Sequence, residues 1–382
     1  MASLSKQIRP VLVARRKKLA AIMESAPENH SFIDLRSEVD SALERIDENS
    51  YGICEVCGKG IEEPDLLANP LLRECITHLP PDEQRKIYRD QGLAKSIGGA
   101  SLLDDVKGAG LEAQEGLEKA TTFGASPWIS TNPKELDLDI NRARLVQSDM
   151  LPAFHLRHEA WEAFYEYIPA GPLGGDYCDL VRTDGGGLFL ILGDAMGKGI
   201  AACMIASQLH ALFHTLLDLK LPLTEMLDRA NRILCECVLT SGNYATLVCG
   251  RASKTGTLEM INAGHLPPLL LRTQGAERLL ATGLPLGLFF TSTYEVTRVD
   301  LKPGDTLLFY TDGITEERDT AGNEYGHERL SHIAVEQKDL PPEGLVRACR
   351  EDVATFASKT VFSDDFTLLA LRRILEGIQT VQ

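Results

Sequence analysis

The hydrophobic pattern of the chain changes its period near residue 150. Before this point apolar residues recur with helical spacing, which predicts helices over about 4–25, 32–46 and 133–150. Beyond residue 160, short apolar runs alternate with Gly, Pro and Asp turns, which predicts strands over 163–168, 177–183, 188–193, 244–251, 257–262, 267–272, 278–281, 295–300, 306–311 and 366–372. Further helices are expected over 199–219, 224–239, 326–337 and 342–357. Strands in runs with helices in pairs indicate an α+β fold, in which helices cover the faces of antiparallel sheets.

The same pattern divides the chain into four segments. Residues 1–94 are expected to hold a helical hairpin, a cysteine-containing segment and a helical piece over 81–93. Residues 95–132 are rich in Gly, Ala and Ser and are expected to be a linker. The linker helix within 133–152 is expected to pair with its copy in a homodimer, and residues 153–375 are expected to form the main domain.

Composition and charge narrow the possible partners. The formal net charge of −16 argues against nucleic-acid binding by the whole chain, because phosphate contacts need clustered Lys and Arg. No apolar run approaches the roughly 18–20 residues of a membrane span, and no secretory signal is evident. Nine cysteines, six of them scattered through apolar segments, do not suggest a disulfide framework. A cytoplasmic protein without membrane contact is expected.

Two aspartates, Asp176 and Asp194, flank a candidate β-hairpin with a loose Gly-rich turn at Asp184–Gly187. A turn near Gly185 would bring the two aspartates level on neighbouring strands, with Cα atoms ~4.5–5.5 Å apart. Two carboxylates this close repel each other unless a cation lies between them, which favours a divalent metal site. The alternative is a surface hairpin with ordinary turn acids.

Two more aspartates stand at the ends of predicted strands. Asp312 follows the apolar run 307–311, and Asp364 precedes the run 366–371. Hard cations such as Mg²⁺ and Mn²⁺ prefer carboxylate oxygens to nitrogen or sulfur ligands. Four strand-terminal aspartates without obvious His or Cys partners therefore fit a two-metal centre.

A separate group of candidate ligands lies in the first hundred residues. Cys54 and Cys57 are followed, after seventeen intervening residues, by Cys75 and His78, which gives C-x2-C and C-x2-H pairs. Two such pairs can complete the tetrahedral shell of a structural Zn²⁺ and leave no position open for water. The alternative is a set of unrelated thiols and an imidazole.

Residues 30–80 resemble the DksA/TraR zinc-finger proteins. The resemblance is carried by Ala42–Ile46, Tyr51–Gly58, Ile61, Leu67–Pro70 and Cys75. This chain has His78 where that family usually has Cys, and its hairpin tip at 25–31 lacks the acidic pattern with which the full-length family acts inside RNA polymerase. The resemblance implies a zinc-stapled helical module, and it leaves polymerase binding open.

Residues 150–373 resemble the SpoIIE/RsbU-type phosphatases, the bacterial branch of the metal-dependent type 2C Ser/Thr phosphatases. Six motifs occur in the family's order: Ala170–Asp179, Gly193–Gly199 with Ala201–Ala202, Asn262–Pro268, Leu284–Gly287, Tyr310–Glu316 and Asp364–Leu369. The resemblance implies a β-sandwich of antiparallel sheets flanked by helices. It also implies hydrolysis of phosphoserine or phosphothreonine on a regulatory protein, for which a STAS-domain anti-sigma-factor antagonist is the expected substrate.

The resemblance also assigns roles to individual residues. Asp176, Asp194, Asp312, Asp364 and the backbone carbonyl of Ala195 would hold two Mn²⁺ or Mg²⁺ ions. Such ions would activate a bridging water and polarise the phosphoryl oxygens for in-line displacement.

Two neighbouring residues receive less direct roles. Asp365 is expected to support the site from behind the ligands. For His265, within an Asn-Ala-Gly-His-Leu-Pro-Pro turn, both a structural role and a proton-donor role are open.

Parts of the sequence suggest two other functions. Gly193–Gly199 is not a phosphate-binding P-loop, because only three residues separate its first Gly from the Gly-Lys pair and Gly199 replaces the required Ser or Thr. A transcription-associated regulator that acts on RNA polymerase through its zinc module is the other alternative. The presence of all four aspartates favours the phosphatase, with the zinc module as its regulator.

Overall fold

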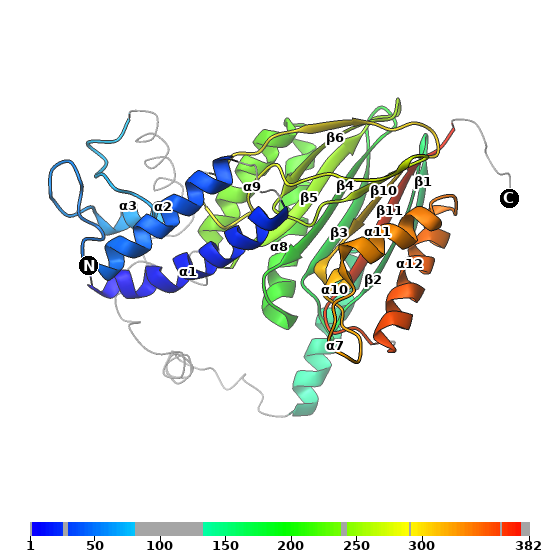
Figure 1. The fold of residues 1–382 in the computed structure, drawn as a ribbon, viewed down its shortest axis with the longest axis horizontal. Coiled ribbons are helices and arrows are strands. Elements are labelled where there is room, and N and C mark those ends of the chain that lie inside the picture. The colour runs from blue at the N-terminus through cyan, green and yellow to red at the C-terminus, as the bar shows by residue number, and fades with distance from the viewer. Residues whose placement is uncertain are drawn as a thin grey trace. The chain divides into compact units, whose positions relative to one another are not determined.

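The computed structural model describes residues 2–25, 30–80, 133–237, 243–289, 292–359 and 361–375. The chain divides into two units, Met1–Asp139 and Ile140–Gln382 (Figure 1). The helix expected over 81–93 and the linker expected over 95–132 lie outside the described residues.

In the first unit, α1 (Ala2–Ser25) and α2 (His30–Asp47) lie antiparallel. Arg9 pairs with Asp47 at 3.1 Å and Arg16 with Asp40 at 3.5 Å, so residue numbers rise along one helix as they fall along the other. The interface is apolar and fully buried at Leu12, Leu19, Val39 and Ala42. A short helix, α3 (Glu63–Ala68), follows the cysteine-containing loop.

The second unit contains two antiparallel sheets. The six-stranded sheet has the order β1-β2-β11-β10-β7-β8, and the five-stranded sheet has the order β3-β4-β5-β6-β9. The bounds are His155–His158 for β1, Trp161–Ile168 for β2, Asp176–Thr183 for β3, Gly187–Ala195 for β4, Ala245–Ala252 for β5, Thr257–Ala263 for β6, Leu269–Arg272 for β7, Gly275–Arg278 for β8, Thr297–Asp300 for β9, Thr306–Tyr310 for β10 and Phe366–Arg373 for β11. Helix α7 (Pro133–Asp149) precedes β1.

Helices cover the outer face of each sheet (Figure 1). Helices α8 (Gly199–Asp218) and α9 (Leu223–Cys237) pack on the five-stranded sheet, and α11 (Gly326–Glu336) and α12 (Pro342–Ala357) pack on the six-stranded sheet. A four-residue helix, α10 (Asp312–Thr315), follows β10. The unit is therefore a four-layer sandwich of helix, sheet, sheet and helix.

The continuous apolar runs of the central strands follow from this layering, since each strand is buried on both faces. Along β4, Leu188, Leu190 and Leu192 enter the core between the sheets. Phe189 and Ile191 alternate with them and contact the α8/α9 side instead. Successive side chains point to opposite faces of a strand, so a run without polar residues requires a cover on each side.

Helix α8, at 20 residues, is long and apolar enough to cross a membrane by length and composition alone. This differs from the expectation that no apolar segment of the chain approaches the length of a membrane span. Ala202, Ile205, Leu209 and Phe213 are buried against the five-stranded sheet, so in this fold α8 is a core helix.

Most predicted elements are present, with four differences. Strand β1 was not predicted, since its four residues, His-Leu-Arg-His, carry a single buried apolar side chain. Strand β8 spans 275–278 rather than 278–281, because the hairpin from β7 reverses at residues 273–274. The short helices α3 and α10 were also not expected, as each has fewer than two turns.

Candidate metal centre

The predicted hairpin is present, and its register brings Asp176 and Asp194 directly opposite each other on β3 and β4. The turn depends on Gly185 and Gly186, whose φ angles of 80° and 81° favour glycine. Side chains of paired residues point to the same face of a sheet, so the two carboxylates share one side of this sheet end.

Two threonine hydroxyls hold the Asp176 carboxylate in place. Thr311, directly before α10, donates from Oγ1 to Oδ2 of Asp176 at 2.9 Å, and Thr367 in β11 donates to the same oxygen. The backbone N–H of Thr367 also donates to Thr311 Oγ1 at 3.1 Å. Asp176 thus links the edge strand of one sheet to β11 of the other sheet and to the residue that directly follows β10.

The surroundings of Asp176 are strongly electronegative. Only 4% of this residue is exposed. Burial raises the pKa of Asp176 well above its usual range, and the negative charge of Asp194 adds to the rise. The Thr367 hydrogen bond opposes it, while Asp365 and Asp312 raise the pKa further. A buried carboxylate among other carboxylates is costly as an anion unless a cation compensates for it.

The two adjacent aspartates before β11 have different partners. Asp365 accepts hydrogen bonds from the backbone N–H of Gly175 at 2.5 Å and of Ala170 at 2.8 Å, so both of its oxygens are held by the loop that leads into β3. Asp364 instead lies on the side of Lys198, whose Nζ is 2.7 Å from Asp364 Oδ2. The hydrogen bond to Asp364 raises the pKa of Lys198.

Glycines let these segments approach closely. A Cβ on Gly174 would overlap the Tyr167 hydroxyl and the Asp365 carboxylate, and a Cβ on Gly313 would overlap the carbonyl oxygen of Asp365. Both glycines therefore fix the distance between the loop before β3, α10 and β11.

Two positioning residues had not been recognised from the sequence. Gln147 of α7 donates from Nε2 to the Gly174 carbonyl at 2.7 Å and accepts from the Gly174 N–H at 3.2 Å. Glu317 is buried and accepts a hydrogen bond from the Ser363 N–H at 2.9 Å, and Lys359 Nζ lies 2.8 Å from its carboxylate. Their sequence signal was weak, because each is a single polar residue with partners far along the chain.

The contacts of His265 favour a structural role over a role as proton donor. Its Nδ1 lies 2.9 Å from Thr246 Oγ1, and its Nε2 lies 3.1 Å from the Tyr310 carbonyl oxygen. The Tyr310 carbonyl can only accept, so Nε2 carries the proton and Nδ1 accepts from Thr246. Both ring nitrogens are thus used to join β5 to the end of β10.

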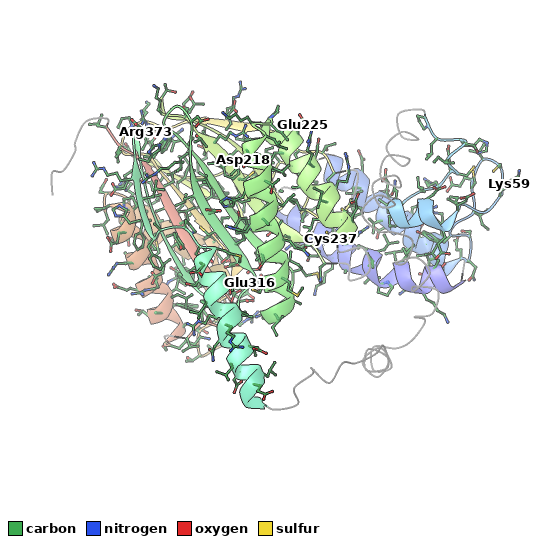
Figure 2. The ribbon with its side chains drawn as sticks, turned by 180° about the vertical axis from the view of Figure 1, so that it is seen from behind. Lys59, Asp218, Glu225, Cys237, Glu316 and Arg373 are labelled. Carbon is green, nitrogen blue, oxygen red and sulfur yellow. The ribbon has the colours of Figure 1, made fainter. Side chains whose placement is uncertain are left out.

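The aspartates gather at one end of the sandwich. In Figure 2, Glu316, which follows α10, lies at the end away from Arg373. Among the residues that the structure describes, two groups have metal-ligand atoms that all lie within 4.8 Å of one another. The four aspartates form neither of these two groups. Ligands shared between two ions, which lie about 3.5–4 Å apart in two-metal sites, need not meet at one point.

One of those compact groups is Cys54, Cys57, Cys75 and His78 in the first unit. Cys57 Sγ lies 3.8 Å from Cys75 Sγ, and His78 Nδ1 lies 3.1 Å from Cys75 Sγ and 3.5 Å from Cys54 Sγ. Two thiolates on one tetrahedral zinc, each about 2.3 Å from the ion, are separated by nearly this distance.

The surroundings of Cys54 favour the thiolate form of its side chain. Burial alone would raise its pKa, but hydrogen bonds from the backbone around Cys75, Cys57 and Val56 and from His78 lower it to about 6. The thiolate is the form that ligates a metal. The structure therefore brings together the four residues that the spacing had predicted, in a form that suits Zn²⁺.

Comparison with known proteins identifies relatives of this chain. A sequence model of the family "Stage II sporulation protein E (SpoIIE)" matches residues 184–374, half of the chain. The phosphoserine phosphatase RsbU of Bacillus subtilis is 24% identical over 242 residues, which cover 63% of this chain and 71% of RsbU. Protein IcfG of Synechocystis is 24% identical over 267 residues, 62% of this chain, but the match spans only 42% of IcfG.

A solved structure shows the same fold. The PP2C domain of SiaA from Pseudomonas aeruginosa superposes with a TM-score of 0.56 at 17% sequence identity, covering 64% of this chain and 99% of the SiaA domain. The expected type 2C sandwich is thus confirmed for the second unit. The resemblance of residues 30–80 to zinc-finger proteins stays a prediction.

Proposed function

The chain belongs to the SpoIIE family, and from this premise we propose that it is a metal-dependent phosphatase that hydrolyses phosphoserine or phosphothreonine in a regulatory protein. The observation that carries the proposal is the buried Asp176, which faces Asp194 across the β3–β4 pair inside an electronegative cluster. The names of RsbU and of a second relative, RsbP, as phosphoserine phosphatases support the substrate class.

The residues present fit a pair of hard divalent cations. Asp176, Asp194, Asp312, Asp364 and the carbonyl of Ala195 would hold Mn²⁺ or Mg²⁺, because oxygen donors suit these ions. When bound, two such ions supply an activated water and polarise a phosphoryl oxygen for in-line displacement. The negative charges that raise the pKa of Asp176 are the charges that the ions would neutralise.

The protein's own groups prepare the site for this chemistry. The hydroxyls of Thr311 and Thr367 orient the Asp176 carboxylate. Asp365 fixes the loop before β3 through Gly175 and Ala170. Lys198, which is mostly exposed at the mouth of the cluster and paired with Asp364, is placed to orient an incoming phosphate dianion. No protein nucleophile is needed.

The test is release of phosphate from a phosphoserine protein by the full chain, with Mn²⁺ or Mg²⁺ and with a chelator. Asp194→Asn and Asp312→Asn are expected to abolish metal-dependent turnover while the fold is kept. Asp184→Asn is the matched control, because it lies in the same hairpin at the opposite end and its side chain is 88% exposed. Full activity in either site variant would overturn the assignment.

For the substrate, we propose a phosphorylated STAS-domain anti-sigma-factor antagonist, in line with the resemblance to RsbU-type enzymes, and a cytoplasmic location. The assay therefore uses the organism's own phosphorylated STAS proteins, with an unrelated phosphoserine protein for comparison. Equal rates on both would refute the STAS assignment. Co-purification with RNA polymerase in a protein without phosphatase activity would support the transcription-associated alternative instead.

We also propose that the N-terminal unit regulates the enzyme and that α7 pairs with its copy in a homodimer. The cysteine cluster supports a zinc-stapled module. The apolar side chains of Leu136, Leu138, Leu145 and Val146 are more than half exposed on α7, which supports a partner for this helix. Metal analysis of the purified protein tests the first part, since absence of zinc would refute it.

A further inference from the structure

A second compact group of candidate metal ligands lies between β3 and α8. It consists of Asp179, His210 and His214, whose ligand atoms all lie within 4.8 Å of one another. Asp179 Oδ2 is 2.6 Å from His214 Nε2 and 3.5 Å from His210 Nδ1. The two imidazole rings have centroids 4.3 Å apart.

Secondary structure explains why these residues meet. His210 and His214 are four positions apart in α8, so they lie one above the other on the same side of the helix. Asp179 lies on β3, over which α8 packs, and Tyr177 two residues earlier is part of the same packed layer. The Tyr177 ring meets the His210 ring edge-on, with centroids 5.9 Å apart.

A hydrogen-bonded pair of His214 and Asp179 explains part of this group, but in the described part of the chain it leaves Nδ1 of His210 without a hydrogen bond. Asp179 Oδ1 accepts from the Leu180 N–H at 2.8 Å, and Oδ2 accepts from the Tyr177 hydroxyl at 3.3 Å and faces His214. Within the described residues, the buried Nδ1 of His210 has no hydrogen-bond partner. A cation between this nitrogen and the Asp179 carboxylate oxygen 3.5 Å away would satisfy a buried polar atom that otherwise has no hydrogen bond to the described residues.

We propose that Asp179, His210 and His214 bind a divalent transition-metal ion of the Zn²⁺ class, separate from the aspartate centre. Two imidazoles and one carboxylate are a common three-ligand zinc set that leaves a fourth position for water. Two ligands at about 2 Å from one tetrahedral ion are themselves about 3.3 Å apart, close to the His210–Asp179 separation. At His214, the ion takes the place of the proton between Nε2 and Asp179 Oδ2. The distance between these two atoms then increases from 2.6 Å.

The position of the site gives it a mechanical consequence. Strand β3 begins at Asp176, and α8 begins directly after the Gly193–Lys198 segment that carries Asp194. An ion held by Asp179 and the two histidines joins this strand to this helix with bonds to both. The proposal does not depend on the phosphatase assignment, because its evidence and its test concern binding.

The test uses the full chain with excess Mg²⁺, which occupies oxygen-rich sites, and titrates Zn²⁺ and then Co²⁺. The wild type is expected to bind one equivalent of Zn²⁺ more than His214→Ala or His210→Gln. Co²⁺ at this site gives visible d–d absorption without the thiolate charge-transfer band that Co²⁺ gives at the cysteine cluster. His332→Gln is the matched control, because His332 also faces an acidic residue four positions away, Glu336, but on the exposed surface of α11.

Two outcomes would overturn the proposal. One is equal Zn²⁺ stoichiometry in the wild type, both site variants and the control. The other is a cobalt spectrum of Cys75→Ser protein that shows no d–d bands, since removal of the thiolate site leaves the nitrogen and oxygen ligands in place. The second measurement needs no change at either histidine, so a folding defect in the histidine variants does not leave the question undecided.

Discussion

At the residue scale, Asp176 shows how one side chain can serve two parts of the fold. It begins β3, faces Asp194 of β4 and accepts hydrogen bonds from Thr367 of β11 and from Thr311, which directly follows β10. An isolated charge at this depth would be unfavourable, and the neighbouring aspartates make ionisation harder. Under the proposed function, bound cations would make the same arrangement favourable, and metal binding would then be coupled to the local fold.

Removal of the Thr367 hydroxyl should weaken metal binding without removing a ligand. Thr367→Val keeps the side-chain shape in β11 but deletes one of the two donors to Asp176 Oδ2. Loss of such an outer partner typically costs about 10–100-fold in metal affinity or activity. We expect the Mn²⁺ concentration for half-maximal phosphatase activity to rise by this factor.

Thr367→Ser, which keeps the hydroxyl, is the matched control and should stay near the wild type. A Thr367→Val enzyme with an unchanged Mn²⁺ requirement would show that Thr311 alone suffices to orient Asp176. Circular dichroism spectra of the two variants should match, because Val keeps the branched shape of the threonine side chain and Ser differs from it by one methyl group only.

At the scale of elements, α11 and α12 are held together by a partly buried brace at one carboxylate. Arg329 donates from Nε and a terminal nitrogen to Asp352 at 2.8 and 3.0 Å, and the Tyr325 hydroxyl donates to Asp352 at 2.6 Å. The Arg329 guanidinium also lies 4.9 Å from the centre of the Phe356 ring. Bidentate pairs of this kind are the stronger class of surface ion pair.

The brace should make stability depend on pH. The Arg329 hydrogen bond lowers the pKa of Asp352 against the opposing effect of burial, with help from Tyr325. A lowered folded-state pKa contributes stability above the unfolded-state pKa of about 3.9, and this contribution is lost as the pH falls through the folded-state pKa.

Asp352→Asn should therefore lower Tm at pH 7 by about 1–4 °C, if the pair contributes about 0.5–1 kcal/mol. The difference from the wild type should shrink as the pH falls below about 4. Differential scanning fluorimetry across this range measures it. Asp339→Asn, at a side chain 93% exposed, is the control, and a variant difference that does not change with pH would contradict the electrostatic explanation.

Helix α7 offers a second prediction at this scale. Leu145 and Val146 are 67% and 63% exposed near the end of the helix, and Gln147 beside them is buried against Gly174. Leu145→Glu combined with Val146→Glu should convert a dimer to a monomer, because charge is poorly tolerated in the centre of an apolar interface. Sedimentation velocity gives the mass, and Arg144→Glu on the exposed surface is the control.

The elements also show what a sequence can reveal. Long apolar runs predicted the central strands within two residues at each end, and the turn glycines predicted the pairing of Asp176 with Asp194. The assignment of strands to two sheets was not predicted, since β2 pairs with β11 across roughly two hundred residues. Hydrogen bonds such as Gln147 to Gly174 and clusters such as Asp179 with His210 depend on packing between elements, which periodicity does not encode.

At the scale of the whole molecule, the two units have separate reasons to be stable. The second unit has three apolar cores around its sheets. In the first unit, the loop from Tyr51 to Pro80 has little regular structure apart from α3. Short segments of this kind usually need a metal or a disulfide to hold one conformation.

Cys75→Ser or strong chelation should therefore unfold the loop around the cysteines and leave the phosphatase unit folded. Apparent zinc-binding energies of about 10–16 kcal/mol in zinc-finger peptides are large enough for metal loss to unfold such a module. Differential scanning calorimetry should show loss of a separate transition. Cys237→Ser, at an exposed cysteine in the other unit (Figure 2), should leave both transitions unchanged.

The position of β11 has a consequence for synthesis of the protein on the ribosome. This strand lies between β2 and β10 in the middle of the six-stranded sheet, and Asp364, Asp365 and Thr367 stand at its beginning. Translation delivers the strand after every other strand of that sheet. A nascent chain that ends before Phe366 lacks this central strand and leaves the facing edges of β2 and β10 unpaired. The six-stranded sheet and the aspartate cluster are thus completed together by the last strand to be synthesised, and until then the unpaired strand edges favour aggregation.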